Sequence, residues 1–368
     1  MLKASSSTFF DCDEALVKDL AKYYALGHER GLMKILAVDS SCDESCAAVI
    51  DTTKWKLLSD VVHSHVDSMK KFGGIVPEIA SREHLKGLPL AIHEALEIAK
   101  LKPTEIDHYV VTNRPGLIGA LLVGLSFTKS LAFSSGKPFS TLNHIEAHLY
   151  SPLLTTLDGN EAPPFPWVAC VVSGGHTEIF HVESLLKYTW LGGTLDDAAG
   201  EAFDKIGKLL NLSYPAGPKI DKWVRESATP ADRSRYRFPR AKTEAHHFSF
   251  SGLKTAVSLQ VKKSDLSNQA EVLALAASAQ EAILDALVIK LLHSQQILGV
   301  NTLVLTGGVA CNSRLREKLP QSYFPIPKHC TDNAAMVALL AACYAKQNRL
   351  VAEDWNTTAY PSGNLIKN

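Results

Sequence analysis

The stretch KILAVDSSCDESCAAVI, residues 34–50, reads as a buried strand, a polar turn and a second strand. The stretch WVACVVSGGHTEIFHV, residues 167–182, follows the same order around a glycine turn. We interpret the two stretches as a weak internal duplication that is matched in pattern rather than in identity. The expected product is an α/β protein made of two related lobes with a cleft between them.

Outward from these stretches, strand and helix signals alternate along the chain. Further strands are expected at residues 61–64, 108–112, 188–191 and 302–306. Helices are expected at residues 77–100, 117–133, 196–210, 269–298 and 332–346. The predicted organisation is an N-terminal extension (1–32), an N-terminal α/β lobe (33–165) and a C-terminal α/β lobe (166–330), with helix 332–346 packed back on the first lobe. A stiff stretch containing Pro163, Pro164 and Pro166 marks the start of the second lobe.

The composition bears on the location and the partners of the chain. Its 368 residues include 38 basic and 38 acidic side chains, so no overall field attracts nucleic acid, and RNA would need a local patch or a partner protein. Its seven cysteines form no CxxC pair, which indicates free thiols in a reducing compartment. No apolar run is expected to span a membrane, and the acidic first 32 residues resemble a short helical extension rather than a transit peptide. These features indicate a soluble cytoplasmic protein, with a mitochondrial location as the alternative.

The sequence NHIEAH, residues 143–148, carries the sharpest chemical signal. Helical positions four apart differ by about 40° around the axis, so His144 and His148 can share one face and one metal ion. Glu146 lies about 200° from His144 and points to the other side. This placement argues against an HExxH metalloprotease, whose glutamate must reach the metal-bound water.

A third metal ligand has to come from elsewhere in the chain. The best candidate is Asp332, just where the last helix begins. The same position is typical of a helix N-cap, and composition alone favours the cap.

Two glycine turns follow buried strands, at Ser173-Gly174-Gly175 and at Thr306-Gly307-Gly308. Glycines there let a phosphate or a nucleoside approach the backbone. Neither turn fits the Walker A or dinucleotide motif, and each alone fits a tight β-turn, but the pair favours a nucleotide cleft. Several carboxylates could line that cleft, although most acidic residues are solvated: Asp39, Asp43, Glu44, Asp196, Asp197, Glu201, Asp204 and Asp221.

Residues 233–242 contain four arginines and one lysine, interleaved with Tyr236 and Phe238. Such a stretch could grip phosphates and stack on a base. A solvated basic loop is the commoner outcome.

Taken together, nine stretches resemble the TsaD transferases, which make threonylcarbamoyl-adenosine in tRNA. They run in family order from about residue 34 to residue 346 and leave residues 1–32 outside. The stretches are SCDES (41–45), FGGIVPEIASREH (72–84), RPGLIGALLVGLSFTKSLA (114–132), NHIEAHLYSPLL (143–154), VSGGHTEI (172–179), DDAAGEAFDKIGKLL (196–210), FSFSGLKTAV (248–257), GGVACNSRLR (307–316) and CTDNAAM (330–336).

The resemblance implies the duplicated ASKHA fold of actin, sugar kinases and Hsp70. It implies one divalent metal ion, iron or zinc, held by His144, His148 and Asp332, which replaces the helix-cap interpretation of Asp332. It places Gly307 and Gly308 under the adenosine of threonylcarbamoyl-adenylate. The other substrate contacts that it implies are Val171, Val172, Ser173, Gly174, Gly175, Asp204, Gly217, Asp221 and Asn312.

The implied reaction moves the threonylcarbamoyl group from the adenylate to the exocyclic amine of the adenosine next to the anticodon, in tRNAs that read ANN codons, and releases AMP. Asp39 stands where the family usually has glutamate, and we predict that it orients or deprotonates this amine. Asn113-Arg114 and Ala216 also depart from the family pattern. The implied partners are tRNA, AMP or ATP and helper proteins, including the synthase that makes the adenylate. A homodimer and a heterodimer with a paralogue both stay open.

Two other functions stay open from the residues alone. A small-molecule kinase on the same fold would need a catalytic aspartate and a sugar pocket, but not the histidine pair. A non-catalytic ATP-binding scaffold of a tRNA-modifying complex would bind nucleotide without turnover.

Overall fold

Two β-sheets form the framework of the computed structural model, which describes residues 33–362. The extension expected at residues 1–32 lies outside the described residues. The first sheet has the order β3-β2-β1-β4-β5 and consists of β1 (Lys34–Asp39), β2 (Glu44–Asp51), β3 (Lys56–Ser64), β4 (His108–Arg114) and β5 (Phe139–Asn143). The second has the order β8-β7-β6-β9 and consists of β6 (Trp167–Val172), β7 (Thr177–Ser184), β8 (Lys187–Gly193) and β9 (Thr302–Thr306).

Strand pairing repeats between the two sheets. Strand β1 pairs antiparallel with β2 and parallel with β4. Strand β6 pairs antiparallel with β7 and parallel with β9. The repeated order confirms the two-sheet α/β fold that the similar openings of the two lobes predicted.

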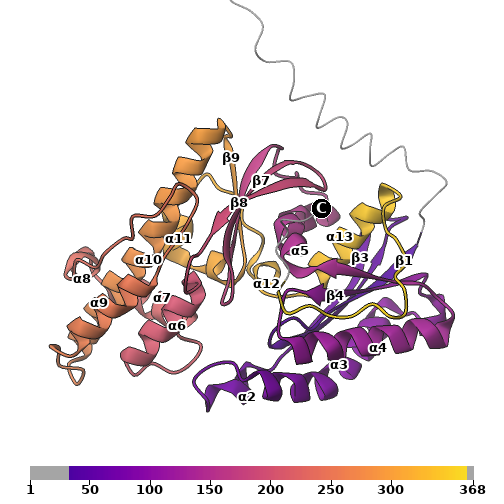
Figure 1. Ribbon diagram of the computed structural model, residues 1–368, viewed down its shortest axis with the longest axis horizontal. Coiled ribbons are helices and arrows are strands. Elements are labelled where there is room, and N and C mark those ends of the chain that lie inside the picture. Colours follow the sequence, from indigo (N-terminus) through magenta and orange to yellow (C-terminus); the bar gives the residue numbers. More distant parts are fainter. Residues whose placement is uncertain (1–32, 363–368) are drawn as a thin grey trace, which may run out of the picture.

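Helices cover the outer faces of both sheets and fill the space between them (Figure 1). On the first sheet these are α3 (Pro77–Ala99) and α4 (Ile118–Ser135), and on the second α6 (Ala199–Leu209), α7 (Ala216–Ser227) and α10 (Gln269–Leu298). Helices α5 (His144–Tyr150) and α13 (Ala334–Lys346) lie between the sheets, where α13 contacts β1 and β2. The remaining helices are short: α2 (Val66–Lys70), η1 (Pro103–Glu105), η2 (Ser151–Asp158), α8 (Pro230–Ser234), α9 (Ser251–Val261), η3 (Gly308–Cys311), α11 (Ser313–Lys318) and α12 (Pro327–Cys330).

Alternating side chains of the central strands build three apolar layers. Ile35 of β1 and Trp167 of β6 point into the core between the sheets, together with most of α13. Their neighbours Leu36 and Val168 point the other way, to the helices on the outer faces. Because successive strand residues face opposite sides, each central strand is buried on both. The shared middle layer therefore holds both lobes against α5 and α13, where the predicted histidine pair lies.

Several elements differ from the sequence expectation. Strand β5 and helices α7 and α9 were not predicted from the sequence. Helices α4 and α10 are long and apolar enough to cross a membrane, contrary to the expectation from the sequence. In α10, however, 72% of the most apolar window is buried, as in the core helix of a soluble protein, and in α4 the figure is 33%. The six cysteines of the described region are free, as expected.

Candidate active site

Helix α5 brings the two predicted histidines onto one face. The helix begins directly at His144, because the side chain of Asn143 accepts hydrogen bonds from the backbone N–H groups of Ile145 and Glu146. The imidazole rings of His144 and His148 lie edge to face with centroids 4.7 Å apart. Both side chains are buried. The helical spacing of the pair is thus confirmed.

Glu146 lies on the opposite side of α5, as its position in the helix predicted. Its carboxylate accepts a hydrogen bond of 2.6 Å from the hydroxyl of Tyr344 in α13. Burial raises the pKa of Glu146, against hydrogen bonds from Tyr344 and Tyr188. The glutamate is engaged in the core between the lobes, so the metalloprotease arrangement is absent among the described residues.

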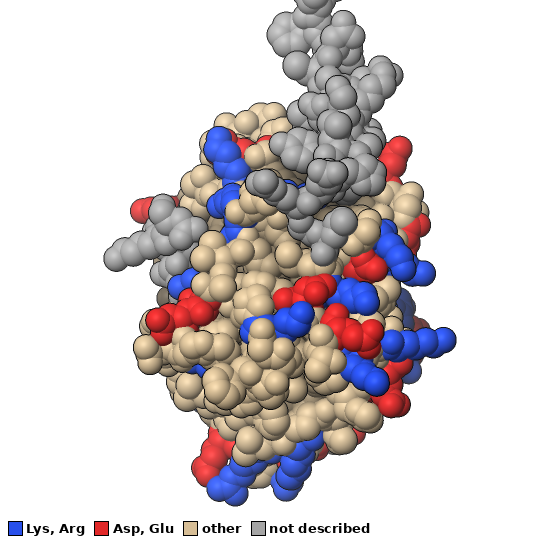
Figure 2. All heavy atoms as spheres, turned by 90° about the vertical axis from the view of Figure 1, so that its right-hand side faces the viewer, with Lys and Arg blue, Asp and Glu red and all other residues tan. Residues whose placement is uncertain are grey.

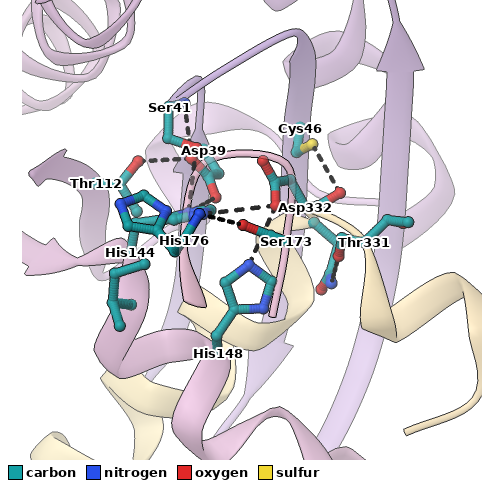
Figure 3. Close-up of polar contacts among 12 residues, drawn as sticks. Asp39, Ser41, Cys46, Thr112, His144, His148, Ser173, His176, Thr331 and Asp332 are labelled. Carbon is teal, nitrogen blue, oxygen red and sulfur yellow. Dashed lines mark hydrogen bonds and ion pairs between the residues drawn. The ribbon is translucent and has the colours of Figure 1, made fainter. Parts of the chain in front are cut away.

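Asp332 faces the histidine pair from the start of α13 (Figure 3). Its Oδ1 lies 3.1 Å from Nε2 of His148 and 3.5 Å from Nε2 of His144. One ligand atom from each of the three side chains lies within 4.8 Å of the others. The N-cap of α13 is the next residue, Asn333, whose side chain accepts from the N–H of Met336. The helix-cap interpretation of Asp332 that composition favoured is therefore wrong, since Asn333 takes that role.

Asp39 contacts Nδ1 of His144, whereas Asp332 faces Nε2 of the same ring. Its Oδ2 accepts from Nδ1 of His144 at 2.8 Å, and its Oδ1 accepts from the Thr112 hydroxyl at 2.8 Å and from the Ser41 backbone at 2.9 Å. The side chain is 1% exposed. In the neutral form of His144, the hydrogen bond to Asp39 favours the proton on Nδ1, and this tautomer leaves Nε2 free for a metal ion. These contacts favour a role of Asp39 in orienting His144.

The charges of this cluster are strongly coupled. Burial disfavours the imidazolium form of His144, but the carboxylates of Asp39 and Asp332 outweigh it and hold its pKa well above the ordinary value. Burial likewise opposes ionisation of Asp332, yet the two histidines hold its pKa well below the ordinary range. Burial lowers the pKa of His148, which keeps this imidazole neutral. The two carboxylates thus stay ionised and create a site that attracts a cation.

The first glycine turn lies beside this cluster, between β6 and β7. The Ser173 N–H donates to the carbonyl of His176, and the N–H of His176 donates to the Ser173 hydroxyl. A Cβ atom at Gly174 or Gly175 would meet no atom within 4 Å, so both positions face open space. Val171 and Val172, which precede the turn, are fully buried in the sheet.

The start of α6 supports this turn, a contact that sequence reasoning missed. The N–H of Gly200 donates to the carbonyl of Ser173, and a Cβ atom on Gly200 would lie 2.6 Å from that oxygen. The hydroxyl of Thr177 accepts from the N–H of Ala199 at the first residue of α6. The string of small residues before the helix was the available signal. A turn with open glycines therefore adjoins the N-terminus of an 11-residue helix.

The remaining predicted substrate contacts surround helices α7 and α11. Asp204 accepts from the backbone N–H of Ala216 at 2.7 Å and from that of Gly217, which tethers the start of α7. Asp221 of α7 accepts from the backbone and the hydroxyl of Ser313. Asn312 caps α11 through the N–H of Leu315 and donates to Gln280 of α10. These polar side chains carry structural hydrogen bonds in addition to any contact with substrate.

The second glycine turn has one crowded position and one open position. Gly307, at φ +95°, lies against the backbone of Val172, whereas a Cβ atom at Gly308 would meet no atom within 4 Å.

In the basic stretch at residues 233–242, Phe238 is buried in the core, so it does not offer a ring to a base. Arg240 is paired with Asp285 at 2.5 Å.

A duplicated α/β fold of the ASKHA type, with a candidate His-His-Asp metal site and two glycine turns between its sheets, defines the class of this protein. The model of the TsaD family, described as tRNA N6-adenosine threonylcarbamoyltransferase, matches residues 56–339. The chain belongs to this family, whose members transfer a threonylcarbamoyl group to an adenosine of tRNA.

Individual relatives agree with this assignment. The tRNA N6-adenosine threonylcarbamoyltransferase of Kosmotoga olearia is 43% identical over 344 residues, which cover 91% of this chain and 99% of the relative. That of Syntrophus aciditrophicus is 45% identical over 317 residues, 84% of this chain and 91% of the relative.

Solved structures support the fold. HypF of T. kodakarensis matches with a TM-score of 0.57 at 13% identity, over 86% of this chain and 48% of HypF. A full-length HypF, solved in a phosphate- and nucleotide-bound form, gives 0.55 at 13% identity, over 87% of this chain and 56% of that one. The ASKHA architecture is thereby confirmed.

Proposed function

We propose that His144, His148 and Asp332 hold one divalent metal ion at the centre of the transfer reaction, and that the ion is iron or zinc. The observation that carries the proposal is the donor set itself: two buried imidazole nitrogens and one oxygen of the partly buried Asp332 carboxylate, all within 4.8 Å of one another. The hydrogen bond from His144 to Asp39 supports the proposal, because metal-bound histidines usually donate their other N–H to a carboxylate. Two histidines and one carboxylate suit either metal. The bound ion supplies Lewis-acid and template chemistry to the carbamoyl oxygen.

The chain's own residues bind the adenylate around this centre. The Ser173-Gly174-Gly175 turn receives the phosphate, since its glycines face open space beside the N-terminus of α6, which favours negative charge. We place Gly307 and Gly308 under the adenosine; a Cβ atom would meet the backbone of Val172 at Gly307 but open space at Gly308. Val171, Val172, Asp204, Gly217, Asp221 and Asn312 complete the proposed contacts.

Asp39 is proposed to act on the reaction through His144. Both of its oxygens are occupied and its side chain is almost completely buried. The incoming adenosine amine, which must be unstacked from the anticodon loop to be reached, would meet the open face of the cluster. We place Asp39 as the residue that orients His144, and deprotonation of the amine by Asp39 stays a prediction.

The tRNA contact is proposed to depend on a local surface and on helper proteins. Figure 2 shows one face of the molecule, on which Lys and Arg alternate with Asp and Glu and form no single-sign patch. Arg235 and Arg237 remain exposed, so they are the proposed phosphate contacts of the basic stretch. The adenylate synthase and a dimer, either of two copies or with a paralogue, are the expected partners. The bacterial relatives support a cytoplasmic location.

The direct test is nucleoside mass spectrometry of unmodified tRNA incubated with the chain and a source of threonylcarbamoyl-adenylate. We expect the modified adenosine with the wild type and with Glu146→Gln, and none with His148→Ala. Binding of nucleotide without any modified adenosine, in the presence of the synthase, would favour the scaffold function. Phosphorylation of a small molecule would favour the kinase.

A further inference from the structure

Behind the loop that carries Asp39 lies a cluster of three polar side chains with no assigned role. Ser45 is the first buried residue after the turn into β2, His84 belongs to α3, and His65 follows the end of β3. The hydroxyl of Ser45 lies 2.7 Å from Nδ1 of His84 and 2.9 Å from Nε2 of His65. Ser45 and His84 are completely buried, and the two rings meet edge to face with centroids 5.3 Å apart.

The hydrogen-bond partners fix the position of each proton in this cluster. Nε2 of His84 faces the carbonyl oxygen of Cys42 at 3.1 Å, and a carbonyl can only accept. Nε2 of His84 therefore carries the proton, and its Nδ1 accepts the proton of the Ser45 hydroxyl. Because that hydroxyl has a single proton, it must accept its second bond from Nε2–H of His65.

The resulting chain runs in one direction from His65 to the backbone of the loop. His65 donates to Ser45, Ser45 donates to His84, and His84 donates to the carbonyl of Cys42. The backbone N–H of His65 also donates to the carbonyl of Asp43 at 2.9 Å. The carbonyl groups of two successive loop residues, Cys42 and Asp43, thus accept hydrogen bonds from His84 and His65.

The side chains in this series of hydrogen bonds are tightly packed. A Cβ atom on Gly87, one turn of α3 beyond His84, would lie 2.6 Å from Cε1 of His65. Burial lowers the pKa of His84, against the carbonyl of Cys42 and the charges of Asp39 and Asp43. A neutral His84 is what the chain requires, because an imidazolium could not accept the proton of Ser45.

The loop held in this way forms one wall of the reaction centre. The hydroxyl of Ser41 lies 3.1 Å from Nδ1 of His144, and the thiol of Cys46 lies 3.7 Å from the carbonyl of Asp332. The first half of the loop is anchored on α4, through Ser40 to the carbonyl of Ala120. The second half of the loop is held by the hydrogen bonds that run from His65 through Ser45 and His84.

We propose that Ser45, His65 and His84 form a hydrogen-bond relay that fixes the backbone of residues 42–43 and so holds loop 41–46 against His144 and Asp332 for threonylcarbamoyl transfer. The relay members are positioning residues and do not touch the substrate. The inference rests on the proposed transfer site, since Ser41 contacts His144 and Cys46 contacts Asp332. Its loss should impair the rate of transfer more than the binding of metal or nucleotide.

The first test compares Ser45→Ala with Ser59→Ala. Ser59 is also buried in the β2–β3 hairpin, but its hydroxyl accepts one bond from the Val49 backbone and lies away from the loop. We expect Ser45→Ala to lower kcat on the order of 10-fold to 100-fold, because small misplacements of reacting groups cost that much. Metal content and AMP affinity should stay at the wild-type level, and Ser59→Ala should keep the wild-type kcat. A wild-type kcat in Ser45→Ala would overturn the proposal.

A second test measures which ring nitrogens of His65 and His84 carry a proton. In protein labelled with 15N-histidine, long-range 15N–1H correlation should show His84 and His65 neutral at pH 7 with the proton on Nε2. A proton on Nδ1 of His84 would overturn the relay, whatever the activity. An inactive wild type with these tautomers present would instead count against the transfer function alone.

A partly buried member gives a variant that should still fold. His65→Gln keeps an amide N–H to donate to Ser45, whereas His65→Leu has no donor. We expect kcat of the glutamine variant to exceed that of the leucine variant by about 10-fold. Equal kcat values in the two variants would show that only packing matters at this position.

Discussion

Replacement of Gly307 by alanine should separate the structural and the ligand-binding duties of the second glycine turn. Gly307 has φ +95° and ψ 164°, a region that only glycine occupies readily. A residue held there costs about 1–3 kcal/mol. A Cβ atom would also lie 2.4 Å from the carbonyl oxygen of Val172, and overpacking of this kind costs about 1–3 kcal/mol. The expected loss is therefore about 2–6 kcal/mol of the free energy of unfolding.

The matched control is Gly308→Ala in the same turn. Its Cβ atom would meet nothing within 4 Å, and its φ is not positive, so the free energy of unfolding should change by less than about 0.5 kcal/mol. Urea denaturation of the two variants and the wild type measures both effects. Equal stability of Gly307→Ala and Gly308→Ala would refute the reasoning from backbone conformation and contact distance.

A larger side chain at the open glycines tests the ligand side of the same argument. Gly308→Val and Gly174→Val should fold as the wild type does, because both positions face open space. Calorimetry with AMP should nevertheless show strongly weakened binding if the nucleotide occupies that space. Wild-type affinity in both variants would make the turns purely structural.

Three further outcomes are expected. His144→Ala should lose its metal in elemental analysis, whereas Glu146→Gln, whose parent carboxylate bonds Tyr344 on the other side of α5, should keep it. Burial lowers the pKa of His108 from 6.5 to about 4. Between these pH values the unfolded chain binds a proton at His108 and the folded chain does not. The free energy of unfolding should therefore fall as pH drops from about 6.5 to about 4. His108→Gln should flatten that dependence in urea titrations at several pH values. Arg235→Glu combined with Arg237→Glu should weaken tRNA binding and its salt dependence in filter-binding titrations while AMP binding persists, and an unchanged salt slope would move RNA recognition elsewhere.

The local part of the site could be predicted because it depends on spacing within one element. His144 and His148 share a face through helical geometry alone, and the same geometry sends Glu146 away to Tyr344. The central strands were equally readable, since their unbroken apolar runs are buried on both faces. Such features need no knowledge of what packs against them.

The non-local part could not be predicted in the same way. Asp332 and Asn333 are both good N-cap residues, and only the fold decides that Asn333 caps α13 while Asp332 turns to the histidines. The sequence left the Phe238 ring available for stacking on a base, but in the structure the ring is buried in the core of the second lobe. The relay on Ser45 joins a strand, a helix and a loop that periodicity cannot place side by side.

The charge balance of the cluster explains why these particular side chains meet at the lobe junction. Asp39 is a buried carboxylate and Asp332 a partly buried one, and each would be costly without a positive partner. Protonated His144 supplies one positive charge between them, which is why its pKa is raised. The proposed divalent ion would add two positive charges and would require a neutral His144, whose remaining proton Asp39 would hold on Nδ1. Two carboxylates, two neutral imidazoles and a dication would sum to zero, so the burial that makes the incompletely paired cluster costly would favour binding of the proposed divalent ion.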